Sequence, residues 1–152
     1  METYESLLEK LSNKGVKFIL VGGLAVDLCG FERATMDVDI IVQRSEENIV
    51  ALIEALKQFG DGSARELSFN DFDLEEGCVR VIEDFPVDIF TIMKGNTYED
   101  LIKYKVVFKA ESGVEIPHLN ADGLILLKQE SARSKDQIDV NELKKGLGRM
   151  TE

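Results

Sequence analysis

The sequence has few of the residues on which several kinds of catalytic and structural chemistry depend. It contains two cysteines without the spacing of a metal site, and they do not make a disulfide framework. We expect Cys29 and Cys78 to be small buried residues in apolar segments rather than redox groups. The one histidine, His118, disfavours catalysis by a histidine metal site or a histidine triad. We expect it in a loop or partly buried at a strand end, with a place in an acceptor pocket as the alternative.

Long hydrophobic runs are also missing. No segment is long enough to cross a bilayer, and the first residues lack the basic segment and apolar core of a signal peptide. The 152 residues, of which 44% are hydrophobic, are expected to form one domain over residues 1–152, with a C-terminal helical segment over 118–152. These features predict a cytoplasmic protein.

Basic residues are in the minority. The chain has 18 Lys and Arg against 29 Asp and Glu, a formal net charge of −11. Because long nucleic acids are bound by neutralising many phosphates, this balance makes nucleic acid an unfavourable partner. It favours a cationic small molecule or a basic partner protein. An RNA end remains the alternative because of one local basic group, formed by Arg133, Lys135, Lys144, Lys145 and Arg149.

Three aspartates in strand-like segments make the main candidate site. Asp37 and Asp39 stand at the head of an apolar run, and alternate residues of a strand point to the same face. Asp88 lies in a second β-rich segment that can pair beside the first. Packed carboxylates repel one another unless a cation lies between them, and Mg²⁺ prefers oxygen ligands. We therefore expect Asp37, Asp39 and Asp88 to bind Mg²⁺ or Mn²⁺.

A glycine pair precedes the first two aspartates. Phe18 to Val21 is typical of a buried strand, Gly22-Gly23 of the turn that leaves it, and Leu24 to Cys29 of a short helix. A glycine turn before a helix lets backbone N–H groups approach a triphosphate without a Cβ in the way. Alone, the pair indicates an ordinary tight turn. Fourteen residues before an Asp-x-Asp pair, it indicates a phosphate site.

The stretch VGGLAVDLCGFERATMDVDI, residues 21–40, resembles the signature of the DNA polymerase β-like nucleotidyltransferase superfamily in its Gly-Gly form. It looks most like small bacterial nucleotidyltransferases that include antitoxin-type and abortive-infection members and, more distantly, the aminoglycoside and lincosamide nucleotidyltransferases. The resemblance is densest over Phe18 to Val42 and weaker over Val87 to Thr91 and Lys128 to Asp139. The wider superfamily more often has serine after the first glycine, so Gly23 lacks a hydroxyl that would bind phosphate.

This resemblance implies an α/β (α+β) fold with a mixed β-sheet flanked by helices and a short C-terminal helical tail. It implies transfer of NMP from an NTP, with ATP favoured, to a hydroxyl, with release of pyrophosphate. Asp37 and Asp39 would bind the metal, and Asp88 would be a third ligand and the candidate base. The residues that would hold the nucleotide are Gly22, Gly23, Arg33, Thr35, Lys128 and Arg133.

Two positively charged segments have alternative roles. Lys128 falls on the inward stripe of a helix that begins near Asn120 or Asp122. It either contacts the nucleotide phosphates or a site carboxylate, or extends past its apolar neighbours to water. Arg133 and Lys135 either reach phosphate or pair with nearby acids such as Asp136 and Asp139, and structural pairing is favoured.

The leading hypothesis is a small transferase, either of the antitoxin type acting on a partner protein such as a toxin, or one that modifies a small molecule. The alternative is a nucleotide-binding module that acts by stoichiometric association without turnover. The three aspartates favour the enzyme, because binding alone does not require Asp88. A further acidic group is expected in a solvated loop beside the site, where it would attract a cationic acceptor rather than form a second metal site: Asp71, Asp73, Glu75 and Glu76.

Overall fold

A computed structural model of the chain describes residues 4–28, 37–58, 66–82, 86–128, 138 and 140–146. The main-sheet strands are β1 (Phe18–Val21), β2 (Val38–Val42), β3 (Val79–Ile82), β4 (Pro86–Phe90), β7 (Lys105–Lys109) and β8 (Glu115–Leu119). The α-helices are α1 (Tyr4–Asn13), α2 (Gly22–Leu28), α3 (Glu46–Lys57), α4 (Tyr98–Leu101) and α5 (Ala121–Lys128). The short elements are the 3₁₀ turns Phe69–Asp71 and Ile102–Tyr104, and the strand pair β5 (Ile92–Met93) and β6 (Asn96–Thr97). The described residues 138 and 140–146 near the C-terminus are also helical.

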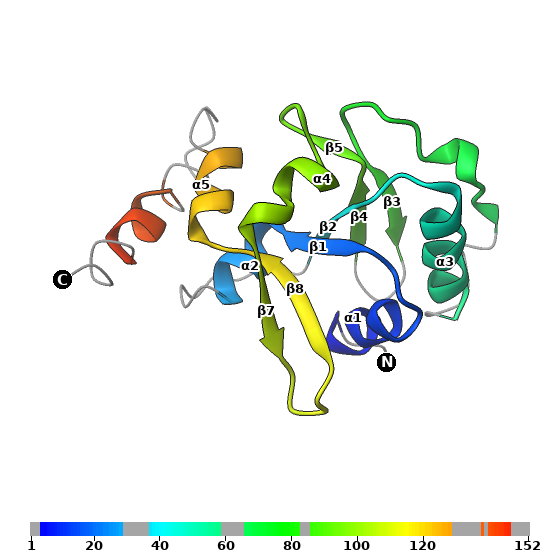
Figure 1. Cartoon of the computed structure of the whole chain (residues 1–152), viewed down its shortest axis with the longest axis horizontal. Helices are drawn as coiled ribbons and strands as arrows, with labels where there is room; N and C mark the ends of the chain where they lie inside the picture. The colour runs from blue at the N-terminus through cyan, green and yellow to red at the C-terminus, as the bar shows by residue number, and fades with distance from the viewer. Residues whose placement is uncertain are drawn as a thin grey trace.

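The six main strands form one mixed sheet in the order β3-β4-β2-β1-β8-β7 (Figure 1). The pairs β3/β4, β1/β2 and β7/β8 are antiparallel, whereas β2/β4 and β1/β8 are parallel. Helices α2 and α5 contact each other, and α1 and α3 contact each other. In Figure 1 the first pair lies to the left of the sheet and α3 to its right. The predicted mixed sheet flanked by helices is confirmed.

The core follows the apolar spacing of the sequence. Leu7, Leu8 and Leu11 form the buried stripe of α1, and α3 buries a similar stripe through Ile49, Leu52 and Leu56. All four residues of the central strand β1 are buried, because helices and neighbouring segments cover both faces of the sheet there. In the described part of the chain, no helix is long and apolar enough to cross a membrane.

Polar side chains fix the helix starts that the sequence predicts. The Ser45 side chain accepts a hydrogen bond from the backbone N–H of Asn48 at the start of α3, and Thr97 does the same at α4. At α5 the cap is Asn120, whose Oδ1 accepts a hydrogen bond from the backbone N–H of Gly123.

Four expectations need correction. Helix α2 begins at Gly22 itself, so the glycine pair opens the helix instead of preceding it. Cys78 is exposed, immediately before β3, and not buried within a strand. His118 lies inside β8 and is buried, so it is not in a loop. Together with Leu119 it extends β8 into the segment we assigned to the C-terminal helices, and α5 begins at Ala121. Cys29 lies outside the described residues.

Asn48 joins α3 to the ends of two strands from a buried position. Its Nδ2 donates hydrogen bonds to the carbonyl oxygens of Lys17 at 3.0 Å and Gln43 at 2.8 Å, and its Oδ1 accepts from the Lys17 N–H at 2.7 Å. Asn48→Ala should therefore lower the free energy of unfolding by about 2–4 kcal/mol, since three hydrogen bonds are lost and the Lys17 N–H is left without its side-chain acceptor. Urea denaturation measures this, with Val50→Ala on the exposed face of α3 as the control. A loss no larger than that of the control would contradict the role.

Candidate active site

A row of residues crosses four neighbouring strands at one end of β1. Val21 of β1 pairs with Asp39 of β2, Asp39 with Asp88 of β4, and Asp88 with Arg80 of β3. Residues directly opposite each other on paired strands point to the same face of a sheet. The side chains of Asp39, Asp88 and Arg80 therefore lie side by side on one face. Asp37 precedes β2 by one residue, and its charge acts on Asp39.

Gly22 brings the start of α2 against this row. Its φ of +75° lies in the left-handed region, where a residue with a Cβ is strained. A Cβ at this position would also collide with the Asp39 carboxylate and stand 3.0 Å from the Asp39 Cβ. Both the backbone conformation and the close approach of Asp39 require glycine here.

The carboxylates of the row repel one another. The pKa of Asp39 is raised to about 6, first by burial and then by the charges of Asp88 and Asp37 and a hydrogen bond with Asp88. The charge of Lys128, at the end of α5, acts in the opposite direction and lowers the pKa of Asp39. The carboxylate cluster is thus short of positive charge at neutral pH.

Asp88 is held by an arginine. Its side chain is 9% exposed, and its two oxygens accept hydrogen bonds from Arg80, Nε to Oδ1 at 2.7 Å and Nη2 to Oδ2 at 2.8 Å. These bonds raise the pKa of Arg80. Partial desolvation and the neighbouring Asp88 raise the pKa of the Cys78 thiol, so Cys78 lies beside Asp88 as a protonated thiol.

The donor set suits a divalent cation, but it is not assembled as a metal centre. Carboxylate oxygens are the ligands that Mg²⁺ prefers, and Asp39 is a carboxylate whose charge its neighbours oppose. Within the described residues, no group of three or more His, Cys, Asp and Glu side chains stands ready to hold a metal ion. The pairing with Arg80 occupies both oxygens of Asp88. The residue types fit a metal, and the position of Arg80 is the obstacle.

The other expected site residues divide into two groups. Gly23 is the second residue of α2, directly after Gly22. Lys128 is partly buried, and its positive charge lowers the pKa of Asp39. Arg33, Thr35 and Arg133 lie outside the described residues, as do Lys135, Asp136 and Asp139.

His118 faces away from the aspartates. It pairs with Leu20, which points to the face opposite that of Val21 and Asp39. Its Nδ1 lies 2.9 Å from the carbonyl oxygen of Leu119, and burial lowers its pKa, which favours the neutral ring. A place for His118 in an acceptor pocket on the Asp39 face is therefore wrong.

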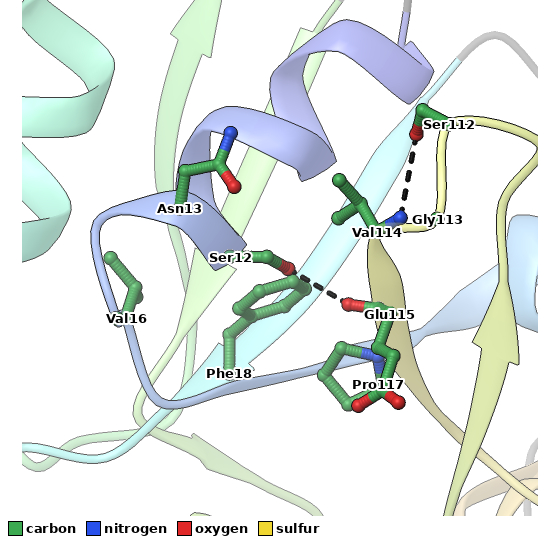
Figure 2. A pocket seen from close by; sticks show the side chains of 10 residues that line it. Ser12, Asn13, Val16, Phe18, Ser112, Gly113, Val114, Glu115 and Pro117 are labelled. Carbon is green, nitrogen blue, oxygen red and sulfur yellow. Dashed lines mark hydrogen bonds between the residues drawn. The ribbon is translucent and has the colours of Figure 1, made fainter.

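Two cavities differ in their relation to the row. One of about 160 Å³ is lined by four acidic residues and reaches Cys78, the neighbour of Asp88; the acids are Asp71, Asp73, Glu75 and Glu76. The other, of about 590 Å³, lies between the end of α1 and the β7–β8 turn (Figure 2). There Ser12 Oγ donates a hydrogen bond to the Glu115 carbonyl oxygen at 3.0 Å. This second cavity includes Phe18, at the end of β1 remote from Asp39.

Arg80 is the site residue that the sequence interpretation missed. The signal for it is an arginine inside an apolar strand, opposite an aspartate in the next strand of a predicted hairpin. The sequence predicts strands over residues 78–82 and 87–92 with the turn at Asp84-Phe85-Pro86, which aligns position 82 with Asp88. Strand β4 instead begins at Pro86, and the observed register pairs Ile82 with Pro86 and Arg80 with Asp88. A shift of one residue in the turn moves the pairing by two.

The class of protein is that of the nucleotidyltransferases, as the family to which the chain belongs shows. The fold is similar to that of a candidate nucleotidyltransferase from Thermotoga maritima, with a TM-score of 0.57 and 21% sequence identity, over 96% of this chain and 91% of that chain. The family described as nucleotidyltransferase of unknown function (DUF6036) matches residues 2–145, and the chain belongs to this family. No curated protein matches the chain.

Proposed function

We propose that the chain transfers NMP from an NTP, with ATP favoured, to a hydroxyl of a small cationic molecule or of a partner protein. The observation that carries this proposal is the row in which Asp39 and Asp88 stand side by side on one face, against a glycine that no other residue can replace. Membership of a nucleotidyltransferase family supports the reaction class. That the chain is of the antitoxin, abortive-infection or aminoglycoside subtype is part of this proposal.

The reaction joins the acceptor oxygen to the α-phosphorus. The bond between the α-phosphorus and the oxygen that bridges to the β-phosphate breaks, and pyrophosphate leaves with the electron pair. Asp88 is proposed to take the hydroxyl proton, and Gly22 and Gly23 leave room for the triphosphate beside α2. Asp37, Asp39 and Asp88 would hold Mg²⁺ or Mn²⁺. Bound there, the metal would neutralise charge on the phosphates and on the leaving pyrophosphate.

The net charge of −11 supports a cationic acceptor. The acidic cavity is not part of this support, because Val79 and Ile89, which line it, alternate with Arg80 and Asp88 and point to the other face of the sheet. The basic group that could bind an RNA end is weaker support for an RNA acceptor, since one of its members, Lys145, pairs with Glu142 at 3.6 Å.

One observation favours a second candidate function. An Asp88 carboxylate paired through both oxygens with Arg80 is neither a metal ligand nor a good proton acceptor. A chain that keeps this pair would bind nucleotide without turnover and act by association with a partner. The two candidates differ in what Asp88 does.

Asp88→Asn separates the two candidates. If Asp88 takes the acceptor proton, the variant should keep ATP affinity within roughly tenfold, about 1.4 kcal/mol, while transfer falls by orders of magnitude. ATP affinity is measured by titration calorimetry with Mg²⁺ present. Transfer is measured as pyrophosphate release and as movement of label from α-labelled ATP onto a panel of cationic hydroxyl compounds and basic polypeptides.

The exposed Glu47→Gln variant of α3 controls for the loss of one negative charge and should match the wild type in both measurements. Wild-type protein that binds ATP but labels none of the panel would favour the binding module. Equal transfer by wild type and Asp88→Asn would remove Asp88 from the mechanism. Labelling of transfer RNA in preference to the cationic compounds would overturn the choice of acceptor.

A further inference from the structure

The Arg80–Asp88 pair places a guanidinium where the proposed function needs a cation. Asp88 is the inner member of the pair, with a side chain 9% exposed, whereas the Arg80 side chain is 50% exposed on the edge strand β3. The arginine can therefore leave by rotating into solvent, and the buried carboxylate stays in place. The asymmetry in exposure gives the pair one movable partner.

A guanidinium and a divalent cation compete for the same atoms. Arg80 takes both carboxylate oxygens of Asp88 at 2.7 and 2.8 Å. This two-bond geometry is specific to arginine, because a lysine presents a single point charge. Asp39 stands next to Asp88 in the same row, so the cation that replaces Arg80 meets two carboxylates at once.

Two of the described residues bring positive charge to the row. Lys128 acts on Asp39 from the end of α5, and Arg80 acts on Asp88 from β3. In the part of the chain that the structure describes, Arg80 is thus the charge that neutralises the third carboxylate. If Arg80 departs without a replacement, Asp88 is left buried and charged beside Asp39, which is unfavourable.

We propose that Arg80 is a positioning residue that occupies Asp88 until the metal and nucleotide arrive, and that it then exchanges its carboxylate partner for the nucleotide phosphates. The proposal rests on the proposed function, since it assumes that Asp88 is a metal ligand. Phosphate offers the same two-oxygen geometry as a carboxylate, so the guanidinium loses no hydrogen-bonding capacity in the exchange. The metal alone then binds weakly, and metal and nucleotide bind cooperatively.

Arg80→Met tests the competition between Arg80 and the metal directly, because it removes the guanidinium and keeps an unbranched apolar side chain. Binding of Mn²⁺ alone, followed by calorimetry or by the electron paramagnetic resonance of free Mn²⁺, should be at least about tenfold tighter in Arg80→Met than in the wild type. The cooperativity between Mn²⁺ and ATP should shrink in the same variant. Neither measurement needs the acceptor or catalytic turnover.

Three further variants make the result specific. Lys57→Met breaks an exposed ion pair with Glu54 and changes the net charge equally, so it reports the general effect of charge on Mn²⁺ affinity. Arg80→Met combined with Asp88→Asn should bind Mn²⁺ without the gain in affinity, because that gain requires the Asp88 carboxylate. Arg80→Lys, which keeps the charge but not the fork, should lie between wild type and Arg80→Met, and it supplies the test if Arg80→Met does not fold.

The outcomes distinguish a failure of the proposed role of Arg80 from a failure of the proposed metal site. Mn²⁺ binding that is measurable but no tighter in the Arg80 variants than in Lys57→Met overturns the role of Arg80 and leaves the metal site standing. A gain that persists when Asp88 is replaced also overturns it. If neither the wild type nor any Arg80 variant binds Mn²⁺, with or without ATP, the proposed metal-dependent transferase is wrong, and the role of Arg80 is wrong with it.

Discussion

Gly22→Ala is expected to reduce nucleotidyl transfer by at least about a hundredfold and to destabilise the fold. The added Cβ would collide with the Asp39 carboxylate, which must move or turn. A displacement of about 1 Å in a positioning group is enough for a loss of this size. The left-handed backbone at φ +75° adds a penalty of about 1–2 kcal/mol to the free energy of folding.

Gly15→Ala is the matched control for this prediction. Gly15 has a nearly identical φ of +71°, but a Cβ there would meet nothing within 4 Å. The backbone penalty should be shared by both variants, whereas the loss of metal and ATP binding should occur only at position 22. Thermal melting gives the first quantity and calorimetry with Mn²⁺ and ATP the second. Unchanged ATP and metal binding in Gly22→Ala would show that the contact with Asp39 is not part of the site.

The elements predicted best are those that depend on local pattern. The stripe of Leu7, Leu8 and Leu11 fixes α1, and Ser45 fixes the first turn of α3, because apolar spacing and caps act over a few residues. For the same reason the sequence predicts a strand pair about Ser112-Gly113, formed by residues 105–108 and 114–116. The β7–β8 hairpin confirms it, although β8 continues three residues further, to Leu119. His118 is carried into the strand by that extension.

The register between strands that are distant in the sequence cannot be predicted from local pattern. The sequence allows the strand of Asp88 to pair beside that of Asp39, as β2 and β4 do, but it does not give the register that sets the two carboxylates opposite each other. That register depends on packing over the whole sheet. Arg80 was missed because its partner depends on where the β3–β4 turn begins, and Pro86 is the first residue of β4, where the missing N–H is tolerated.

Asp39→Asn is expected to stabilise the metal-free protein while abolishing its response to metal and nucleotide. The pKa of Asp39 rises from 3.8 in the unfolded chain to about 6 in the fold, so the folded state favours the protonated form. The resulting stabilisation is complete below about pH 4 and is lost as the pH rises through 6. At pH 7.5 the charged group costs about 2–3 kcal/mol, which Asn avoids. This corresponds to a melting temperature roughly 4–10 °C higher for the variant.

The difference in free energy of unfolding between wild type and Asp39→Asn should change sign when metal and nucleotide bind. Without metal, the advantage of the variant should be near zero at pH 4, grow between pH 4 and 7, and level off above. With Mg²⁺ and ATP at about 100 times the dissociation constant, the wild type alone should gain about 2.7 kcal/mol, because the cation supplies the charge that the row lacks. Glu47→Gln removes the same charge from an exposed position on α3 and should change neither quantity. If Asp39→Asn is less stable than wild type in metal-free buffer at pH 7.5, the charge of Asp39 does not destabilise the fold. A bound cation then cannot act by relieving such a destabilisation.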